Sequence, residues 1–508
     1  MPTEVELKLT APPADLPELR KALAGMAPAA VTSQKRLVST YYDTQDVALK
    51  RRGLTFRVRE QDGRFVQTVK SADLAKLGAL SRGEWEDPLP DSRPDFDAPE
   101  SGGQLHLPDP ITDDLRPLFV TEVTRTAVDV EPVRGTRIEA AIDEGEIRSA
   151  GGDAAEPISE IELELKDGNS AALYDLALRL LEVAPIRIVT DSKSERGYRL
   201  IEGAETASQA VHAEPVALDR EMTVDSALQE IGRNCLAQAL RNQLPVLERK
   251  PEGIHQMRVA VRRLRSAISS LKEMLPAEDR RWVDEELRWL GGALGQARNF
   301  DVFSTELLPA ARAGMANGAG WDELAGTLDR LRRSASDRAR EAVLSERYTG
   351  AMLHLLRWFE ARGWREAVLP NSSIGDIAGP VLERRRHKLR QRSKGFDRLG
   401  PRERHKLRIA AKKLRYTIEL LGGLFDKSDL HAYTRKLKGL QDDLGYANDV
   451  RVAHDFLPEL FAEVDPRGPA AHAWISVLEW HDQRLAVRER RLRKHLRRLT
   501  RATPFWTV

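Results

Sequence analysis

Short segments in the first 200 residues alternate apolar and polar side chains with a period of two, which is the pattern of β-strands with one buried face. Gly, Pro, Asp and Asn turns separate these segments, and two helical patterns interrupt them, near residues 14–25 and 169–183. The strand segments are 3–10, 36–42, 53–60, 64–70, 80–87, 118–130, 136–147 and 157–166. The pattern predicts an α+β domain over residues 1–202.

The pattern changes after this domain. Residues 203–219 have no periodicity and predict a linker. Thr223 is a predicted helix cap, and segments rich in Leu, Arg and Glu then follow with helical spacing to about residue 500. We therefore expect an all-α domain over residues 220–500.

The helical half also repeats itself. The motif HQMRVAVRRLR at His255 returns as HKLRIAAKKLR at His405, and LGQARNFDV at Leu294 returns as LGYANDVRV at Leu444, in both cases 150 residues later. Two motif pairs with one offset predict an internal duplication. We expect two related helical bundles, at about residues 220–365 and 374–500.

Charge divides the chain in the same place. Residues 1–200 contain 26 Lys and Arg against 36 Asp and Glu, a net charge of −10, and the remainder contains 54 against 42, a net of +12. Such asymmetry predicts two domains with different ionic partners. No apolar run is long enough to span a membrane, the N-terminus lacks a signal-peptide core, and the only cysteine, Cys235, has no disulfide partner. We expect a cytoplasmic protein without a membrane partner.

The polar faces of the predicted strands are nearly uniform in charge. An ordinary sheet, apolar inside and charged outside, would explain any single strand, but solvated faces usually mix residue types. The inferred faces are EIELEL at 160–165, EVELKL at 4–9, TFRVR at 55–59, VQTVK ending at Lys70, GEWE at 83–86 and RIEAAID with Arg137, Glu139 and Asp143. If the strands close into a barrel with apolar faces outward, these charges converge inside it.

Such an interior would be unstable if it were empty and dry. Divalent cations and a polyanion would satisfy it, because carboxylate oxygens suit Mg²⁺ or Mn²⁺ and arginine forks suit phosphate oxygens. The pattern therefore indicates a metal- and phosphate-binding interior.

Together with YYDT at 41–44, GLTFRVR at 53–59, IDEGEI at 142–147 and SKSERGY at 192–198, these segments resemble the CYTH superfamily of triphosphate tunnel metalloenzymes. The motifs occur in the expected order over residues 2–200. The resemblance implies a closed eight-stranded antiparallel tunnel barrel that hydrolyses a triphosphate with a divalent metal, Mg²⁺ or Mn²⁺.

The resemblance also implies roles for individual residues. The candidate metal ligands are Glu4, Glu6, Asp143, Glu162 and Glu164. The candidate phosphate-binding residues are Lys8, Arg57, Arg59, Lys70, Arg125, Lys193 and Arg196. Lys8, Glu84 and Glu86 are the candidate catalytic residues, either glutamate being able to activate water, and the general base stays unassigned.

Each histidine-led motif predicts a helix with a core face and a separate basic stripe. At 100° per residue the stripe residues fall within about 80° of one another; they are His255, Arg258, Arg262 and Arg265 in the first copy and His405, Arg408, Lys412 and Arg415 in the second. A solvated basic face is the ordinary alternative, but neither stripe contains a glutamate to relieve the repulsion. For the two histidines, a structural role and a phosphate contact both stay open.

These motifs resemble the CHAD family (conserved histidine α-helical domain) over about residues 220–500. Its members are commonly fused to CYTH domains, and the resemblance implies binding of inorganic polyphosphate. Nucleic acid is the rival polyanion, but the basic faces carry no interleaved aromatic residues for base stacking, and no helix-turn-helix or zinc spacing occurs.

We therefore expect a metal-dependent inorganic triphosphatase fused to a polyphosphate-binding helical domain. One alternative is a non-catalytic polyphosphate-binding or granule-targeting protein, which the complete carboxylate set opposes. Another is an adenylate cyclase or thiamine-triphosphatase of the same fold, which needs a base or thiazole pocket that the sequence does not reveal. The physiological substrate, the metal preference and the oligomeric state stay open.

Overall fold

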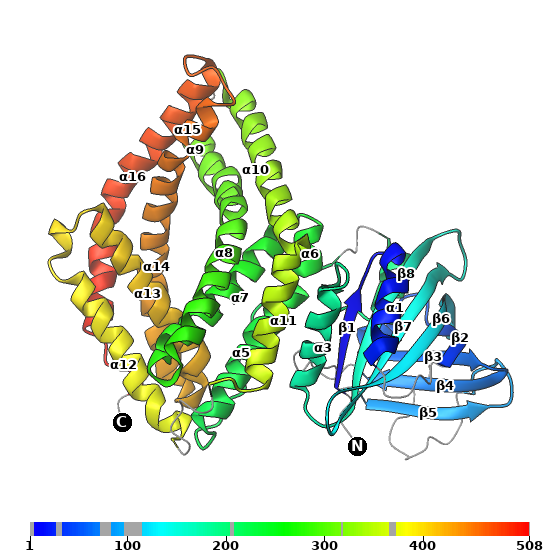
Figure 1. The fold of residues 1–508 in the computed structure, drawn as a ribbon. Helices are drawn as coiled ribbons and strands as arrows, with labels where there is room; N and C mark the ends of the chain where they lie inside the picture. The colour runs from blue at the N-terminus through cyan, green and yellow to red at the C-terminus, as the bar shows by residue number, and fades with distance from the viewer. Residues whose placement is uncertain are drawn as a thin grey trace. The chain divides into compact units, whose positions relative to one another are not determined.

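A computed structural model describes residues 5–26, 33–71, 83–95, 114–203, 208–315, 318–364 and 372–506. Its contacts divide the chain into two compact units (Figure 1). The strand unit consists of Met1–Gln209 and Leu344–Ala361, and the helical unit consists of Ala210–Val343 and Arg362–Val508. No helix in the described part of the chain is long and apolar enough to cross a membrane.

One antiparallel sheet forms the centre of the strand unit, with the strand order β5-β4-β3-β2-β6-β7-β8-β1-β9. The strands are β1 (Val5–Thr10), β2 (Ser33–Asp43), β3 (Leu54–Gln61), β4 (Arg64–Ser71), β5 (Gly83–Leu89), β6 (Arg116–Val133), β7 (Thr136–Ser149), β8 (Ala155–Asp167) and β9 (Arg187–Ile188). The eight segments predicted from alternation are all strands, and where the structure describes their ends these agree to within three residues.

The prediction of a closed eight-stranded barrel is confirmed only in its antiparallel sheet. The sheet has a ninth strand, β9, and among the described residues its edge strands β5 and β9 do not pair with each other. The two-residue strand β9 is too short to produce a period-two pattern. Closure into a tunnel is therefore not confirmed.

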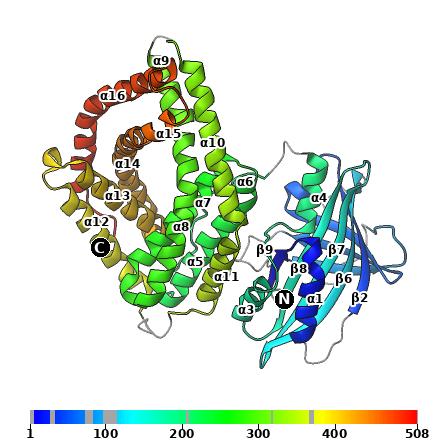
Figure 2. The ribbon, with the colours of Figure 1, turned by 45° about the horizontal axis from the view of Figure 1, so that its top comes forward.

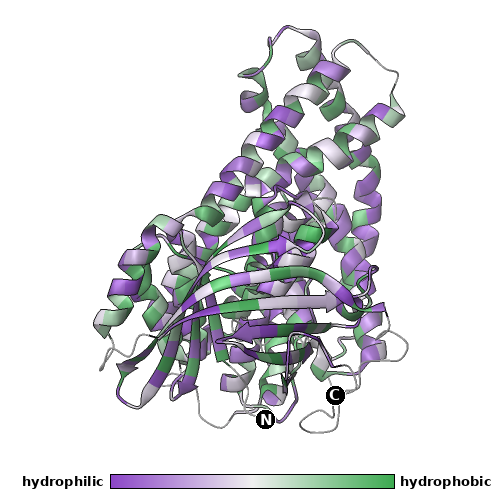
Figure 3. Cartoon of the chain, turned by 90° about the vertical axis from the view of Figure 1, so that its right-hand side faces the viewer, coloured by the Kyte–Doolittle hydropathy of each residue, from purple (hydrophilic) through white to green (hydrophobic). Residues whose placement is uncertain are grey.

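Alternation along the strands separates an apolar face from a charged one, as the bands of Figure 3 show. Leu7 and Leu9 of β1 and Ile161 and Leu163 of β8 are fully buried, and the residues between them face a cavity. The helices α1 (Leu16–Met26) and α3 (Ala171–Leu181), both predicted, pack against strands of the sheet. A short helix, α2 (Ala48–Arg51), precedes β3.

A helix that the periodicity did not predict, α4 (Lys193–Glu202), packs against β6 and β7. A capping box begins it, since Ser192 Oγ accepts from Glu195 N at 3.2 Å and Glu195 accepts from Ser192 N at 2.6 Å. Tyr198 packs edge-on against Phe119, with ring centroids 5.2 Å apart, and a Cβ at Gly197 would lie only 2.1 Å from that ring. The glycine therefore allows α4 to approach the sheet.

One more helix of the strand unit comes from far along the chain. α11 (Glu346–Glu360) packs on α3. Arg357 forms an ion pair with Asp175, and Ser170 Oγ donates a hydrogen bond to Glu360 Oε1 at 2.6 Å. The strand unit is therefore not one continuous segment of the chain.

The helical unit repeats its helices at the predicted offset (Figure 2, where the first repeat is mainly green and the second yellow to red). Three helices of the first repeat begin 150 residues before their counterparts in the second. They are α5 (Val224–Arg241), α7 (Pro251–Ser270) and α8 (Ala277–Val302), with the counterparts α12 (Ile374–Ser393), α13 (Pro401–Leu421) and α14 (Lys427–Asp455). The other helices are α6 (Gln243–Leu247), α9 (Leu308–Gly314), α10 (Trp321–Leu344), α15 (Leu457–Phe461) and α16 (Pro469–Thr500).

The two repeats are joined where they begin. Val224 N donates to Ser372 O at 3.1 Å, and its equivalent Ile374 N donates to Met222 O at 2.8 Å. The predicted cap at Thr223 is confirmed, since its side chain accepts from Ser226 N at 3.2 Å. These reciprocal bonds place α7 against α13, the two helices that carry the basic stripes.

Candidate active site and anion-binding groove

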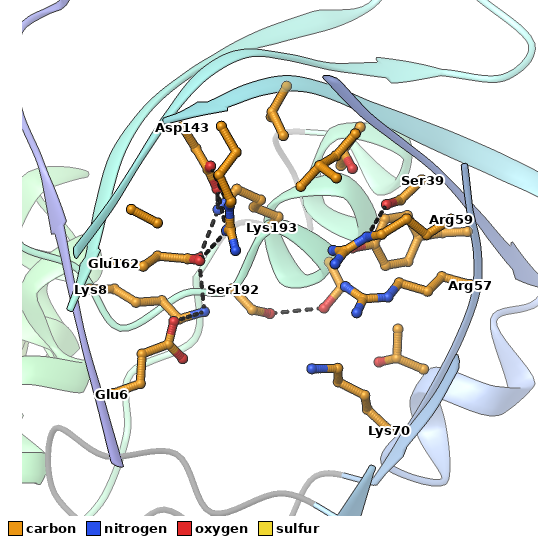
Figure 4. Close-up of a pocket in the computed structure, with 18 of the residues that line it drawn as sticks. Glu6, Lys8, Ser39, Arg57, Arg59, Lys70, Asp143, Glu162, Ser192 and Lys193 are labelled. Carbon is orange, nitrogen blue, oxygen red and sulfur yellow. Dashed lines mark hydrogen bonds and ion pairs between the residues drawn. The ribbon is translucent and has the colours of Figure 1, made fainter. Parts of the chain in front are cut away.

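The charged strand faces meet in a cavity of about 200 Å³ in the strand unit (Figure 4). Eleven of the residues predicted for the site line it: Glu6, Lys8, Arg57, Arg59, Lys70, Glu86, Arg125, Asp143, Glu162, Glu164 and Lys193. Glu4 and the side chain of Glu84 lie outside the described residues. The inward orientation expected for EIELEL is thus observed for Glu162 and Glu164.

Arg196 is the predicted phosphate-binding residue that the structure places elsewhere. Its guanidinium contacts Glu156 at 2.7 Å, Glu160, and the Pro157 carbonyl at 2.6 Å, and it does not line the cavity. Arg196 lies three residues after Lys193 on α4, so the two share a helix face and both contact Glu160. The Arg196 guanidinium nevertheless ends at Glu156 and the Pro157 carbonyl, outside the lining of the cavity.

The carboxylates of β7 and β8 are held by three cations on one side of the cavity. Lys193 Nζ lies 2.8 Å from both Asp143 and Glu162 and 2.6 Å from Glu160. Arg125 binds Asp143 through two nitrogens, at 2.6 and 2.7 Å, and also contacts Glu162, which Lys8 approaches to 3.4 Å. Asp143 and Glu160 are almost completely buried.

These contacts set the protonation of the cluster. Burial alone would raise the pKa of Glu162, but Lys193, Lys8 and Arg125 outweigh burial and hold it well below its ordinary value. The pKa of Asp143 is lowered by Lys193 and Arg125 against the same effect of burial. The pKa of Lys193 rises although burial opposes it, because Glu162, Asp143 and Glu160 surround the amine. Glu162, Asp143 and Lys193 are therefore all charged at neutral pH.

The opposite side of the cavity is cationic. Figure 4 shows Arg57, Arg59 and Lys70, from β3 and β4, across from Glu6, Lys8 and Glu162. Burial and the neighbouring Arg57 lower the pKa of Arg59 to about 10, and Arg59 Nε donates to Ser39 Oγ at 3.1 Å. This half of the cavity presents guanidinium groups to whatever enters it.

Several lining residues were absent from the predicted site. Glu139 lies beside Glu164, which lies beside Glu6, so three carboxylates form a row across β7, β8 and β1. The RIEAAID alternation already placed Glu139 on the face of Asp143 and could have identified it. Thr55 alternates with Arg57 and Arg59 in TFRVR and could have been identified in the same way. Tyr41, Thr121, Ser192 and Ser194 also line the cavity.

The carboxylate side fits a hard divalent cation by its donor chemistry. Glu6, Glu139, Glu162 and Glu164 offer the oxygens that Mg²⁺ and Mn²⁺ prefer. Lys166 Nζ, 2.7 Å from Glu164, and Lys8 Nζ, 3.3 Å from Glu6, are their counter-charges. No three His, Cys, Asp or Glu side chains are gathered as a ready-made metal site within the described ranges.

A second site lies in the helical unit, where the basic stripes meet in a groove of about 840 Å³ between α7, α8 and α13. Of the predicted residues, Arg258, Arg262, Arg265, His405, Arg408 and Lys412 line it. His255 is half-buried outside the lining, and Arg415 forms an ion pair with Glu419 at 3.1 Å. α8 adds Arg280, Arg281 and Arg288, which lie outside the repeated motif and so were missed.

The centre of this groove contains cations that form no ion pairs within the described part of the chain. Among the described residues, Arg258, Arg262, Arg408 and Lys412 form no ion pair, whereas Arg265, near the edge of the set, binds Asp284 at 2.9 Å. Burial and Arg262 lower the pKa of Arg258 to about 10, and burial, Arg262 and Arg408 lower that of Lys412 to about 6. Burial and Arg298 lower the pKa of His255 to about 4. By its chemistry the groove is a candidate site for an anion.

Comparison with known families identifies a different family in each half of the chain. The CYTH domain profile matches residues 2–198, and the CHAD domain profile matches residues 230–458. The chain belongs to the CYTH and CHAD families. The resemblance drawn from the motifs is therefore confirmed, with the cavity in the CYTH domain and the groove in the CHAD domain.

Individual relatives match one domain or the other. An inorganic triphosphatase of Haemophilus influenzae is 33% identical over 199 residues, which are 39% of this chain and 54% of the relative. An uncharacterized protein of Mycobacterium tuberculosis is 27% identical over 183 residues, 34% of each chain. The crystal structure of the CHAD domain from the plant Ricinus communis is 30% identical, with a TM-score of 0.50, and the match covers 57% of this chain and 96% of that one. The chain thus spans about half or less of the curated relatives it matches.

Arg59 should be far more important for binding tripolyphosphate than an arginine of the preceding turn. We expect Arg59→Ala to lower kcat/KM for tripolyphosphate on the order of 10²-fold, because a charge-assisted contact is worth roughly 2–4 kcal/mol. The matched control is Arg51→Ala, because Arg51 is exposed and pairs with Asp46 at 2.9 Å. Equal, small losses in both variants would contradict a role of the Arg59 face in the site.

Proposed function

We propose that the CYTH domain hydrolyses inorganic triphosphate with a divalent metal and that the CHAD domain binds inorganic polyphosphate. The charge balance of the cavity carries the first part. Among the described residues, six acidic and six basic side chains line the cavity, so an entering triphosphate would bring several negative charges that these residues do not compensate. A divalent cation on the carboxylate side would restore neutrality, and the carboxylates provide the oxygens to hold it.

In this proposal the two sides of the cavity divide the work. Glu6, Glu162 and Glu164, with Glu4, would hold the metal, which supplies positive charge against the phosphate oxygens. Arg57, Arg59 and Lys70 bind the phosphate chain from the opposite side and orient it. Lys8, Lys193 and Arg125 stay between the carboxylates and fix their positions. Closure of the sheet around the substrate belongs to the same proposal.

The attacking water needs a positioned base, and Glu86 is the described candidate. Its carboxylate accepts a hydrogen bond from Thr68 Oγ1 at 3.2 Å, on the cationic side of the cavity. Such a carboxylate can take a proton from water that attacks a phosphate held by Arg57 and Lys70. Glu84 is the alternative base on the same strand.

The lining supports an inorganic substrate over a nucleotide or thiamine compound. Tyr41 is the single aromatic residue among the described lining residues, and its ring is stacked on Phe119 at 4.6 Å. An adenine or thiazole ring would therefore lack a free aromatic surface. A cytoplasmic location stays a prediction from the sequence, and a polyphosphate-binding role without catalysis stays the rival hypothesis.

One assay tests the triphosphatase. We expect phosphate release from tripolyphosphate in preference to ATP and thiamine triphosphate, with Mg²⁺ or Mn²⁺ and not with EDTA. Glu162→Gln should lower this rate on the order of 10²-fold, because it removes a metal-binding charge. The control is Glu156→Gln on the same strand, since Glu156 contacts Arg196 outside the cavity. Thermal unfolding checks that both variants are folded. Undiminished turnover in EDTA would reject the proposal.

The CHAD groove should bind long-chain polyphosphate through its unpaired cations. We expect the double reversal Arg408→Glu with Lys412→Glu in the full chain to weaken binding on the order of 10²-fold, and wild-type affinity to fall steeply with salt. Arg435→Glu with Lys438→Glu makes the same charge change on exposed residues of α14 outside the groove, and should change affinity little. Duplex DNA should compete poorly. Comparable losses in both double variants would indicate a general charge effect.

Binding should also take up a proton. Burial, Arg262 and Arg408 keep Lys412 mostly neutral above a pKa of about 6, with Asp449 and Arg258 as its other charged neighbours. A bound polyanion favours the charged amine, so above pH 6 the complex gains up to one proton and affinity rises as the pH falls toward 6. Calorimetry at pH 8 in buffers of different ionisation enthalpy measures this uptake.

Arg replaces Lys412 without losing charge, and it does not release its proton at pH 8. Lys412→Arg should therefore bind polyphosphate with little proton uptake, whereas Lys438→Arg, the same change outside the groove, should behave as wild type. Binding by the wild type with no proton exchange would refute the proton linkage.

A further inference from the structure

The groove of the CHAD domain contains a buried hydroxyl that the basic stripes do not explain. Tyr416 of α13 lines the groove and is 2% exposed, and its hydroxyl has no hydrogen-bond partner among the described residues. A buried hydroxyl left unpaired destabilises the folded state, because it has lost its hydrogen bonds to water and gained none. In a native protein a buried polar group without a partner calls for an explanation, and a role in binding a ligand is one such explanation.

The neighbours of this hydroxyl indicate what kind of ligand atom would suit the site. The Nε atoms of Arg258, Arg262 and Arg408 are also buried without partners. Every one of these three atoms is a donor, and a tyrosine hydroxyl can both donate and accept. The hydroxyl accepts from none of them, so these four groups have no acceptor among the described residues. An oxyanion, which offers only acceptors, would satisfy all four groups together.

The position of Tyr416 within the duplication supports this interpretation. The equivalent residue in the first repeat, 150 positions earlier, is Ser266, which is 5% exposed and lines the same groove. Each hydroxyl follows a stripe cation by one helical turn, Ser266 after Arg262 and Tyr416 after Lys412. Both repeats therefore present a neutral hydroxyl beside their cations, and that of Tyr416 reaches further from the backbone.

The ring of Tyr416 contacts a neighbouring guanidinium group. The guanidinium of Arg415 lies over it, 4.7 Å from the ring centroid. Arg415 is thus a stripe residue by its angle on the helix, yet its contact is with the tyrosine ring and Glu419. A ring fixed in this way loses little conformational entropy when its hydroxyl binds a ligand.

We propose that the Tyr416 hydroxyl donates a hydrogen bond to a phosphate oxygen of the polyphosphate bound in the groove. The inference rests on the proposed polyphosphate binding and adds a contact that is not ionic. The surrounding cations attract any polyanion through long-range electrostatics, whereas the hydroxyl forms a hydrogen bond only with an oxygen at one position. It therefore fixes the position of the chain along the groove.

The test is Tyr416→Phe in the full chain, which removes one oxygen and keeps the ring. We expect the Kd for long-chain polyphosphate to rise about tenfold, as for the loss of one hydrogen bond to a charged group. The slope of log affinity against log salt should stay as in wild type, because no charge is lost. Arg408→Gln should instead reduce that slope by about one.

Two further variants separate binding from packing. Tyr433→Phe removes an equally buried hydroxyl from the core of the same unit, outside the groove, and should leave the Kd unchanged. Ser266→Ala should raise the Kd less than Tyr416→Phe does. Without polyphosphate, Tyr416→Phe should unfold at the same temperature as wild type or higher, because an unpaired hydroxyl has been removed.

The outcomes distinguish this contact from the function on which it rests. Wild-type binding with an unchanged Kd in Tyr416→Phe would overturn the contact and leave polyphosphate binding in place. Equal losses in Tyr416→Phe and Tyr433→Phe, or a reduced salt slope in Tyr416→Phe, would also overturn it. A wild-type protein that does not bind polyphosphate would overturn both.

Discussion

Charges that are removed from water must find counter-charges, and the two domains meet this requirement in different ways. In the CYTH cavity, Glu162 and Asp143 are neutralised inside the protein by Lys8, Lys193 and Arg125. In the CHAD groove, Arg258, Arg408 and Lys412 face one another without carboxylate partners among the described residues, so burial and repulsion lower their pKa values. In the proposed function the cavity therefore binds a cation and an anion together, and the groove binds an anion alone.

The duplication creates the groove, and later divergence makes its two sides unequal. Two reciprocal backbone hydrogen bonds, Val224 to Ser372 and Ile374 to Met222, join equivalent positions of the two repeats. His255 lies near the cation Arg298, which helps lower its pKa to about 4, whereas the equivalent neighbour of His405 is the neutral Asn448. His255 is therefore neutral at pH 7 and lies half-buried outside the lining of the groove, while His405 lines the groove.

Periodicity predicted the strands well because each has one apolar and one charged face over many residues, as β8 does from Ala155 to Asp167. It missed α4, whose short polar sequence becomes helical through the Ser192–Glu195 capping box and the packing of Tyr198 on Phe119. Motif positions located Lys193 correctly in the cavity but could not show that Arg196, on the same helix, points elsewhere.

The same limit applies to the groove. The angular stripe included Arg415, although Glu419 follows one helical turn later on α13 and pairs with it, which the i,i+4 spacing could have shown. The spacing does not show that Arg415 also covers the ring of Tyr416. The sequence pattern does not identify Tyr416 as a groove residue, because its burial and its unpaired hydroxyl depend on tertiary packing, where α7 lies against α13. Side-chain direction and tertiary partners are what local patterns leave undetermined.

The origin of α11 has a consequence for biosynthesis. This helix lies within the CHAD match, at Glu346–Glu360, yet it packs on α3 of the strand unit. A ribosome that has just completed the last strand and α4 has still to synthesise more than a hundred residues before this helix emerges. The surface of α3 that α11 covers therefore stays exposed while the first helical repeat is being synthesised. Domain order in the gene and order of completion in the folded protein are consequently not the same.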